Sequence, residues 1–315
     1  MLHSIYTASA PGKIILMGEH AVVYGRPAMA APVFQVQATA TLTVEDDATE
    51  LWIDAVDLNQ RLALSTAPPA DPLAQALRLT LAALQRPAPG GELHVRSTVP
   101  VAGGMGSGAA VSTAIVRAVA AWAGQALPPA AVSALAFEVE RLHHGTPSGI
   151  DNTVIAYAQP VWFVKGQPPQ PFAIPHPFWL VIASTGIASP TRETVGDVRR
   201  QWQADPARFE SLFDQVADLV NAGRAAMLAG DWSRLGARMT ANHAILGQMG
   251  VSAPILDRLV AAANAAGAFG AKLSGGGRGG NVIALVDPAA AAAVAQAVHD
   301  AGAAAVIITP VDVNT

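Results

Sequence analysis

The chain has 315 residues, a formal net charge of −4 and only 13% charged residues, so its composition indicates no basic surface for nucleic acid or an anionic membrane. Cysteine is absent, which excludes disulfides, thiol nucleophiles and thiolate metal ligands. The N-terminus has no basic stretch followed by an apolar run, and the most apolar tract, 282–310, is interrupted by charged residues and proline. We therefore expect a cytoplasmic protein without a secretory signal or a membrane-spanning helix.

The first half of the chain is predicted to mix strands and helices. Alternation of apolar and polar residues is typical of half-buried strands, and Asp71 followed by Pro72 is typical of a capped helix start. The predicted strands cover 33–44, 51–56 and 92–98, and the predicted helices cover 72–85, 107–123 and 129–143, the last ending before Gly145.

The second half is predicted to begin after a proline-rich connection, GQPPQPFAIPHP, at 166–177. We expect the domain boundary there, with an N-terminal domain over 1–175 and a C-terminal domain over 176–315. The expected C-terminal elements are a strand at 178–184, several helices within 191–266, strands at 269–274 and 281–286, a helix at 288–301 and a strand at 304–309. This order of elements predicts a ferredoxin-like, split-βαβ plan.

The segment KLSGGGRGGN, 272–281, matches the dinucleotide fingerprint G-x-G-x-x-G at Gly275, Gly277 and Gly280. A dinucleotide-binding glycine loop must lead from a strand into a helix, because the pyrophosphate lies at the helix N-terminus. Here the glycines lead into NVIALV, an apolar and β-branched run that predicts a strand. We therefore interpret the segment as a hairpin connection and the fingerprint as coincidental.

A second glycine-rich segment, PVAGGMGSGAAVSTAIV at 100–116, is predicted to pass from a strand into a helix that begins near Ser107. Glycines let backbone N–H groups approach an anion, and the helix N-terminus adds a favourable dipole, so the loop can hold a phosphate. A tight strand-to-helix turn without a ligand explains the same residues equally well. The segment alone leaves both interpretations open.

A third segment, PGKIILMGEHAVVYGRPAMA at 11–30, contains Lys13 beside a turn and Glu19 next to His20. A single lysine is usually a solvated surface charge, and a single Glu–His pair is more often structural than catalytic. Three such loops in one chain favour a functional site over these simpler interpretations.

Four segments in order resemble the galactokinase, homoserine kinase, mevalonate kinase and phosphomevalonate kinase (GHMP) superfamily: PGKIILMGEHAVVYG, PVAGGMGSGAA, HGTPSGIDN and GAKLSGGGRGGNVIAL. The forms GEHAVVYGRPAMA and HGTPSGIDNTV, with NHAILGQMGVSAPILDRLV at 242–260, resemble the mevalonate kinase family in particular. The similarity runs from about residue 10 to about residue 286, nearly the whole chain.

This resemblance implies an α+β fold with an N-terminal α+β domain of the ribosomal-protein-S5 type and a C-terminal ferredoxin-like βαββαβ domain, the active site lying in the cleft between them. It implies an ATP-dependent kinase that uses Mg²⁺ and phosphorylates the primary (C5) hydroxyl of mevalonate to 5-phosphomevalonate in isoprenoid biosynthesis.

The alternatives to this activity are another small acceptor, such as phosphomevalonate or a sugar, and a non-catalytic ligand-binding protein with the same fold. Galactokinase-like chains would carry an aspartate soon after the Glu–His pair, where this chain has AVVY at 21–24, which argues against a sugar. The sequence leaves a homodimer open.

For catalysis, the resemblance implies Asp151 and Lys13. Phosphoryl transfer to an alcohol requires a carboxylate near the hydroxyl proton and a cation near the developing charge. Asp151 matches the family's catalytic aspartate in SGIDN, and Lys13 matches the motif-one lysine. Without the family pattern, the simpler interpretation is that Asp151 caps a loop before a strand at Thr153.

For the metal, the resemblance implies Glu140 and Ser107. On the helix predicted over 129–143, Glu138 and Glu140 lie on either side of the apolar face, so geometry alone does not choose between them. The family's spacing selects Glu140. The family's second loop commonly reads GLGSSAA, and its second serine is replaced here by Gly108, which leaves Ser107 as the hydroxyl for Mg²⁺.

For the ligands, the resemblance implies two further groups of residues. The predicted ATP contacts are Gly103, Gly104, Met105, Gly106, Ser107, Gly108, Gly275, Gly276, Gly277 and Arg278. The predicted mevalonate contacts are Glu19, His20 and Thr191. Arg278 replaces a glycine that is common in the family, and it either adds a positive charge near phosphate or points into solvent. The residues expected to serve structure or to lie at the surface are His143, His144 and His243.

Overall fold

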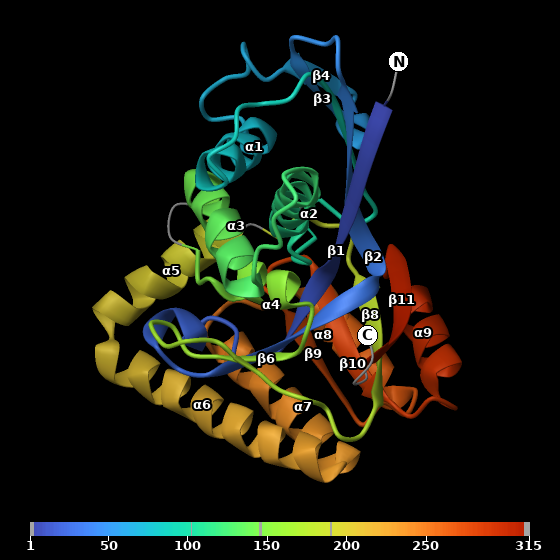
Figure 1. Ribbon diagram of the computed structural model, residues 1–315. Helices are drawn as coiled ribbons and strands as arrows, with labels where there is room; N and C mark the ends of the chain where they lie inside the picture. Colours follow the sequence, from blue (N-terminus) through green and yellow to red (C-terminus); the bar gives the residue numbers. More distant parts are fainter. Residues whose placement is uncertain (1–2, 102, 145–146, 190, 312–315) are drawn as a thin grey trace. The chain divides into compact units, whose positions relative to one another are not determined.

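The structure is a computed structural model that describes residues 3–101, 103–144, 147–189 and 191–311 (Figure 1). The chain forms two compact units, and neither is a single continuous stretch of sequence. Unit 1 consists of Met1–Gly12, Val36–Pro100 and Gly106–Ala158, and unit 2 consists of Lys13–Gln35, Val101–Met105 and Gln159–Thr315. The first two strands, β1 (His3–Met17) and β2 (Ala28–Glu45), run from one unit into the other.

The sheet of unit 1 has its core on one face. Its strands are β3 (Leu51–Ala55), β4 (Gln60–Ala63) and β5 (Gly91–Ser97) with the adjoining parts of β1 and β2. They lie in the order β4-β3-β5-β2, and β1 also pairs with β2. Along β3, Leu51, Ile53 and Ala55 are buried and Trp52 is exposed, the alternation expected of a sheet with one covered face.

Three helices of unit 1 begin at a capping residue or directly after a glycine. The helices of this unit are α1 (Pro72–Ala83), α2 (Ser107–Trp122), α3 (Pro129–His144) and α4 (Ile150–Tyr157). α1 begins as the sequence predicts, since the Asp71 carboxylate accepts a hydrogen bond from Ala74 N at 2.9 Å and Pro72 occupies the first turn. α2 and α4 each follow a glycine in the left-handed region, at φ +73° and +89° respectively.

Helix α4 corrects one sequence-based interpretation. Residues 150–157 are helical, so the alternative that expected a strand at Thr153 is wrong. The β-branched run after Asp151 gave a local strand signal, but contacts with α3 decide the outcome.

The sheet of unit 2 has the ferredoxin-like order. Its strands are β8 (Phe178–Ser184), β9 (Gly270–Ser274), β10 (Asn281–Val286) and β11 (Ala305–Val311). They lie in the order β11-β8-β10-β9, and every neighbouring pair is antiparallel. The glycine-rich segment joins β9 to β10, strand to strand, so the predicted hairpin is confirmed. The predicted α+β fold with a ferredoxin-like plan is also confirmed.

The remaining elements of unit 2 surround this sheet. Its helices are α5 (Thr191–Ala204), α6 (Pro206–Ala229), α7 (Trp232–Gln248), α8 (Pro254–Ala265) and α9 (Ala291–Asp300). Two short strands, β6 (Val161–Phe163) and β7 (Gln170–Pro171), pair with each other, and β6 pairs with the start of β2. The central strand β10 is buried at every position. The described helices are all too short or too polar to cross a membrane.

Several elements were not predicted from the sequence. They are β1, β4, β6, β7, α4 and the short 3₁₀ helices η1 (Ala21–Tyr24) and η2 (Val56–Leu58). β1 contains Pro11 and Gly12, residues typical of a turn, yet it continues as a strand through both. The helix end predicted at Gly145 lies outside the described residues, and the domain boundary at 175 stays a prediction.

Helix α7 lies directly against the start of β9 at Gly236. A Cβ atom added to Gly236 would overlap the backbone carbonyl of Phe269 and lie 2.7 Å from Gly270 N. These clashes are with backbone, which cannot move aside as a flexible side chain can. Gly247, also in α7, has no atom within 4 Å of its added Cβ. Substitutions at these two glycines of one helix therefore distinguish the effect of close packing from the effect of helix propensity.

We predict that Gly236→Ala lowers the free energy of unfolding by roughly 3 kcal/mol, since the added methyl group forces α7 away from β9. Gly247→Ala should leave stability unchanged or raise it by up to about 1 kcal/mol, because alanine is the better helix former. Thermal and urea denaturation followed by circular dichroism would measure both variants. Equal midpoints would contradict the close approach of α7 and β9.

Candidate active site

The predicted site residues are distributed over both units. Unit 2 contains Lys13, Glu19, His20, Gly103, Gly104, Met105, Thr191, Gly275, Gly276, Gly277 and Arg278. Unit 1 contains Gly106, Ser107, Gly108, Glu140 and Asp151. The second glycine-rich segment therefore passes from unit 2 into unit 1 between residues 105 and 106.

Lys13 lies near the end of β1 and is buried, with 3% of its surface exposed. Its Nζ donates a hydrogen bond to Gly104 O at 3.0 Å, and its backbone N donates to Met105 O at 3.0 Å. A buried ammonium group is costly unless polar groups surround it. The lysine expected beside a turn therefore stands in a strand, with its ammonium group against the second glycine-rich segment.

Glu19 forms a buried ion pair with Lys272 of β9. The Lys272 ammonium group contacts Glu19 Oε1 and Leu273 O, and the Lys272 and Glu19 side chains are 0% and 1% exposed. Burial raises the pKa of Glu19 and lowers the pKa of Lys272, and in each case attraction to the partner opposes that shift. Removal of one partner would leave the other buried without compensation. The pair therefore fixes the Glu19 carboxylate beside β9.

His20 joins the loop after β1 to the glycine-rich hairpin. Its Nε2 lies 3.1 Å from Gly276 O, and since a carbonyl oxygen only accepts, Nε2 carries the proton. Burial lowers the pKa of His20 to about 4, and the positive charges of Arg278 and Lys272 act in the same direction. The imidazole is therefore neutral at neutral pH, and its Nδ1 is an acceptor.

Thr191 and Ser189 approach the same hairpin glycine. A Cβ added to Gly276 would lie 2.6 Å from Thr191 Oγ1 and 2.9 Å from Ser189 Oγ. Ser189 Oγ also donates to Gly277 O at 2.9 Å. The structure thus brings together His20 and Thr191, two of the three predicted mevalonate contacts, around Gly276.

Two buried polar atoms of this cluster, Glu19 Oε2 and His20 Nδ1, have no hydrogen-bond partner among the described residues. Such atoms are rare in folded proteins, because each loses its hydration without compensation. An ionised carboxylate and the unprotonated nitrogen of a neutral imidazole both accept hydrogen bonds. A hydroxyl group is a donor of the kind that either atom lacks.

Ser274 and Asn281 tie the two ends of the hairpin to other segments of unit 2. Ser274 Oγ donates to Ile15 O at 2.9 Å and accepts from Ile15 N at 3.1 Å. The Asn281 side-chain amide donates to Gly103 O. These contacts hold β1, the hairpin and the first part of the second glycine-rich segment in one cluster.

Arg278 anchors the hairpin to two other parts of unit 2. Its backbone is in the left-handed region at φ +55°, where glycine is favoured, and its N–H donates to Val251 O at 2.9 Å. The guanidinium group pairs with Asp197 of α5 and donates to Gly250 O at 3.1 and 3.2 Å. Hydrogen bonding to Arg278 lowers the pKa of Asp197. Arg278 therefore does not simply point into solvent, and its contact with phosphate stays a prediction.

In unit 1, Asp151 lies in the first turn of α4, which is anchored to α3. Asn152 Nδ2 donates to Ser133 O at 3.1 Å and to Ser133 Oγ at 2.8 Å, and Thr153 Oγ1 donates to Gly149 O at 2.7 Å. A carboxylate in the first turn is favoured by the helix dipole and by N–H groups that lack partners within the helix. Asp151 therefore belongs to an anchored helix rather than to a loop before a strand.

Glu138 and Glu140 have different surroundings on α3. Glu138 is exposed and pairs with Arg141 at 2.9 Å. Glu140 is half-buried, and its Oε1 lies beside Gly108 in the first turn of α2, where an added Cβ would be only 2.7 Å away. Ser107 is the first residue of that helix. The structure thus brings Glu140 to the helix start that carries Ser107 and leaves Glu138 at the surface.

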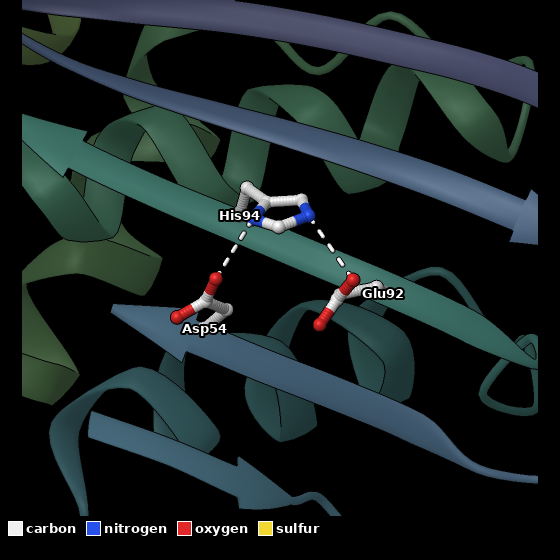
Figure 2. A group of neighbouring side chains, drawn as sticks. All are labelled: Asp54, Glu92 and His94. Atoms are coloured by element: carbon white, nitrogen blue, oxygen red, sulfur yellow. Dashed lines mark ion pairs between the residues drawn. The ribbon is translucent and has the colours of Figure 1, made fainter. Parts of the chain in front are cut away.

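A separate group of charged side chains lies on the open face of the unit 1 sheet. Figure 2 shows His94 of β5 between Asp54 of β3 and Glu92 of β5, with helices behind the sheet. His94 Nδ1 lies 3.0 Å from Asp54 Oδ2, His94 Nε2 lies 3.1 Å from Glu92 Oε2, and Arg61 donates to Glu92 at 3.0 Å. The two imidazole nitrogens face different carboxylates, whereas a metal ion needs its ligands to converge on one point. We interpret the group as a surface ion-pair network.

His243 links α7 to neighbouring elements of unit 2. Its Nδ1 accepts from Leu273 N at 3.3 Å, and its Nε2 lies 3.1 Å from Asp257 Oδ1. Burial lowers the pKa of His243. These contacts agree with the structural role expected for it, whereas the side chains of His143 and His144 lie outside the described residues.

Comparison with known proteins shows the family to which the chain belongs. A family model of the GHMP kinases N terminal domain matches residues 72–159, and a model of the GHMP kinases C terminal domain matches residues 224–304. The chain is 33% identical over 319 residues to a mevalonate kinase of Thermococcus sibiricus, with 94% of this chain and 93% of the relative covered. The chain belongs to the GHMP kinase family.

Further relatives of this GHMP kinase agree with that assignment. A mevalonate kinase of Pyrococcus furiosus is 32% identical, with 94% of this chain and 93% of the relative covered. Among solved structures, L. major mevalonate kinase in complex with R-mevalonate has a TM-score of 0.85 and 29% identity, and the match covers 98% of this chain and 96% of that chain. The resemblance found in the four sequence segments is confirmed, and the chain is an ATP-dependent kinase with the two-domain α+β fold of its family.

Sequence reasoning missed Lys272, Ser274 and Asn281 as parts of this GHMP kinase's candidate site. The lysine within the apolar strand GAKLS was a usable signal, because a charged side chain in a buried strand requires a partner. Ser274 and Asn281 stand at strand ends, where polar residues are common and carry no comparable signal. Their role became visible only through their contacts with Ile15 and Gly103.

We predict that His20 makes the stability of this GHMP kinase depend on pH between its ordinary pKa of 6.5 and its folded pKa of about 4. In this window the unfolded chain binds a proton that the folded imidazole does not, so the free energy of unfolding falls as pH falls. The full effect is about 3 kcal/mol, from the size of the shift.

Urea denaturation at several pH values between 6.5 and 4 would measure this dependence. His20→Gln keeps a polar side chain that does not titrate, so its stability should fall less than that of the wild type over the same range. Identical pH dependence in both proteins would contradict the buried, neutral state of His20.

Proposed function

We propose that this kinase transfers the γ-phosphoryl group of ATP to the primary hydroxyl of mevalonate and produces 5-phosphomevalonate. The observation that carries the proposal is the pair of buried acceptors without donors, Glu19 Oε2 and His20 Nδ1, in a chain that matches a mevalonate kinase over 94% of its length. We further propose that the enzyme acts in the cytoplasm, in isoprenoid biosynthesis. A homodimer stays a prediction that light scattering of the purified protein would test.

The choice of mevalonate as the molecule that is phosphorylated rests on the direction of hydrogen bonds. Glu19 Oε2 and His20 Nδ1 accept, so they suit a ligand that donates, and each hydroxyl group of mevalonate has one O–H donor. Phosphorylation of the primary hydroxyl removes one of these two donors, because a phosphate monoester at neutral pH presents mainly acceptor oxygens, and one of the two atoms would then lack a donor. The direction of hydrogen bonding therefore favours mevalonate over its phosphorylated product at these residues. We assign Thr191, which lies against the same hairpin, to the same ligand.

The nucleotide side of the proposal rests on backbone amides. We assign residues 103–108 and 275–278, Arg278 included, to the ATP phosphates. Left-handed φ values occur at Gly104, Gly106, Gly275 and Gly277. Such conformations turn successive N–H groups toward one side and form a nest for an anion. The first of these segments leads into α2, whose first-turn N–H groups have no partners within the helix.

For the chemical step, we assign Asp151 as the carboxylate that accepts the hydroxyl proton and Lys13 as the cation that stabilises the oxygen as the proton leaves. The freed electron pair of that oxygen forms the new bond to the γ-phosphorus, the bond to the bridging oxygen of the β-phosphate breaks, and ADP leaves. The anchored helix under Asp151 and the buried ammonium group of Lys13 support these roles, since both limit movement.

Glu140 and Ser107 are the residues that we assign to Mg²⁺. A carboxylate and a hydroxyl are oxygen donors of the kind that Mg²⁺ prefers, and the missing Cβ of Gly108 leaves room for the Glu140 carboxylate at the start of α2. When bound with ATP, Mg²⁺ neutralises charge on the phosphates. Glu138 is left out because it pairs with Arg141 at the surface.

A coupled assay of ADP release tests the choice of acceptor. With ATP and Mg²⁺ present, we expect turnover with mevalonate and only background rates with phosphomevalonate or galactose. Turnover confined to one of the other acceptors would replace mevalonate but keep the kinase reaction. Nucleotide binding without turnover of any acceptor would favour a non-catalytic ligand-binding protein.

Asp151→Asn is expected to lower kcat by about 10²–10⁴-fold, the range for loss of a general base. Nucleotide affinity, measured by calorimetry with an ATP analogue, should persist because the amide keeps the size of the carboxyl group. Asp54→Asn is the matched control, since Asp54 belongs to the surface network of the same unit. Wild-type turnover in Asp151→Asn would remove Asp151 from the mechanism.

A further inference from the structure

Lys272 is a charged residue in the middle of β9, a strand that is buried at every position. Lys272 and Ser274 point to the same side of β9, because neighbouring side chains of a strand alternate. On that side Ser274 contacts Ile15 of β1, and Lys272 contacts Glu19 of the following loop. Replacement of a buried ion pair by apolar side chains is often neutral or stabilising. Stability alone therefore does not explain why this strand carries a lysine.

The contacts of Lys272 leave the two carboxylate oxygens of Glu19 in different states. The ammonium group contacts Glu19 Oε1 and also Leu273 O, so two acceptors fix its position. Glu19 Oε2 has no hydrogen-bond partner among the described residues. A lysine ammonium group is a compact point charge, whereas an arginine guanidinium group often binds both oxygens of a carboxylate. The pair thus uses one oxygen of Glu19 and leaves the other available.

We propose that Lys272 is a positioning residue for mevalonate: its ammonium group holds Glu19 Oε1 and keeps the carboxylate charged, so that Oε2 is a fixed acceptor for a substrate hydroxyl. The inference rests on the proposed function, because it takes mevalonate as the ligand of Glu19. The Lys272 side chain is 0% exposed, and its ammonium group contacts Glu19 and Leu273 O. Lys272 therefore acts through Glu19 rather than by contact with the substrate.

The charges around this pair show what Lys272 contributes. Burial raises the pKa of Glu19, while attraction to Lys272, hydrogen bonds from Lys272 and from the Glu19 backbone, and attraction to Lys13 oppose that shift. Burial lowers the pKa of Lys272, and among the described residues Glu19 is the carboxylate whose attraction opposes this shift. The pKa values of His20 and His243 are lowered by burial and also by the charge of Lys272. Loss of Lys272 therefore removes the largest effect that keeps Glu19 ionised.

A protonated Glu19 would bind a hydroxyl group less well than the carboxylate does. Hydrogen bonds to charged acceptors are roughly twice as strong as those between neutral groups. Without Lys272, burial favours the protonated form of Glu19, and the binding of mevalonate then depends on pH. Loss of one hydrogen bond to a charged group corresponds to roughly a 10- to 100-fold change in kcat/KM.

The test is Lys272→Met, which keeps an unbranched side chain and removes the charge. We would measure kcat/KM for mevalonate with the full-length protein between about pH 6 and about pH 9. Each value is divided by the wild-type value at the same pH, so that titration of the ATP phosphates cancels. We expect a ratio of roughly 0.01 to 0.1 near neutral pH that rises as pH rises, because ionisation restores the charged acceptor. The KM for ATP should keep its wild-type value.

Arg26→Gln is the matched control, because Arg26 anchors the other end of the same loop. Arg26 pairs with Glu210 and Asp214 of α6. Loss of these contacts can loosen the loop but does not remove the partner of Glu19, so the ratio for Arg26→Gln should not vary with pH. The same flat ratio in Lys272→Met would show that Lys272 only supports the fold and would overturn the inference.

The double variant Lys272→Met/Glu19→Gln decides the matter if Lys272→Met does not fold, since an unpaired buried charge is costly. The double variant contains neither charge, so its thermal midpoint and its KM for ATP should match the wild type. Its kcat/KM for mevalonate should stay low at every pH. A wild-type kcat/KM for mevalonate would overturn the inference. An equal loss for both substrates would also overturn it, because the pair would then serve the fold alone.

The wild-type protein separates this inference from the proposed function. Absence of mevalonate turnover by the wild type would overturn the proposed function and the inference with it. Wild-type turnover of mevalonate, combined with flat ratios in both Lys272→Met and Arg26→Gln, would keep the proposed function and overturn only the positioning role of Lys272.

Discussion

The buried ion pair between Glu19 and Lys272 is the constraint on which the arrangement of the predicted mevalonate contacts depends. Neither charge can stay in the core of unit 2 without the other, so the loop after β1 must remain against β9. That position sets His20 against Gly276, and the same glycine meets the start of α5. One electrostatic requirement thus orders a loop, a hairpin and a helix start. It also leaves two acceptor atoms in place before any ligand arrives.

Glycines, which lack a side chain, determine where distant segments of the chain can approach one another closely. Gly236 and Gly270 let a helix touch a strand, Gly276 lets two hydroxyl-bearing residues approach the hairpin, and Gly108 lets a carboxylate approach α2. In each case the requirement comes from a neighbour that is distant in sequence. The number of glycines therefore does not reveal their roles. The atom that an added Cβ would meet identifies the contact that each glycine permits.

Much of the fold could be predicted because its signals are local. Asp71 with Pro72 predicts the start of α1, and the apolar run at 281–286 predicts β10 and hence a hairpin. β1 could not be predicted from its own residues, since Pro11 and Gly12 favour a turn and pairing with β2 overrides them. For the candidate site, the motifs supplied the residues but not their surroundings. The partner of Glu19, the surroundings of Glu140 and the anchoring of α4 all depend on contacts between distant segments.

The discontinuous make-up of unit 2 has a consequence for the newly made chain. Lys272 follows Glu19 by 253 residues, so a ribosome must add that length of chain after Glu19 before this carboxylate can meet its partner. Until then, burial of the unpaired Glu19 carboxylate would be costly, so Glu19 stays in water. The loop after β1 also lacks the strand β9 against which it packs. The four strands of the unit 2 sheet, β8 to β11, all follow residues 13–35 in the chain and are synthesised after them. The arrangement around Glu19 and His20 therefore forms only after Lys272 has been synthesised, long after these two residues themselves.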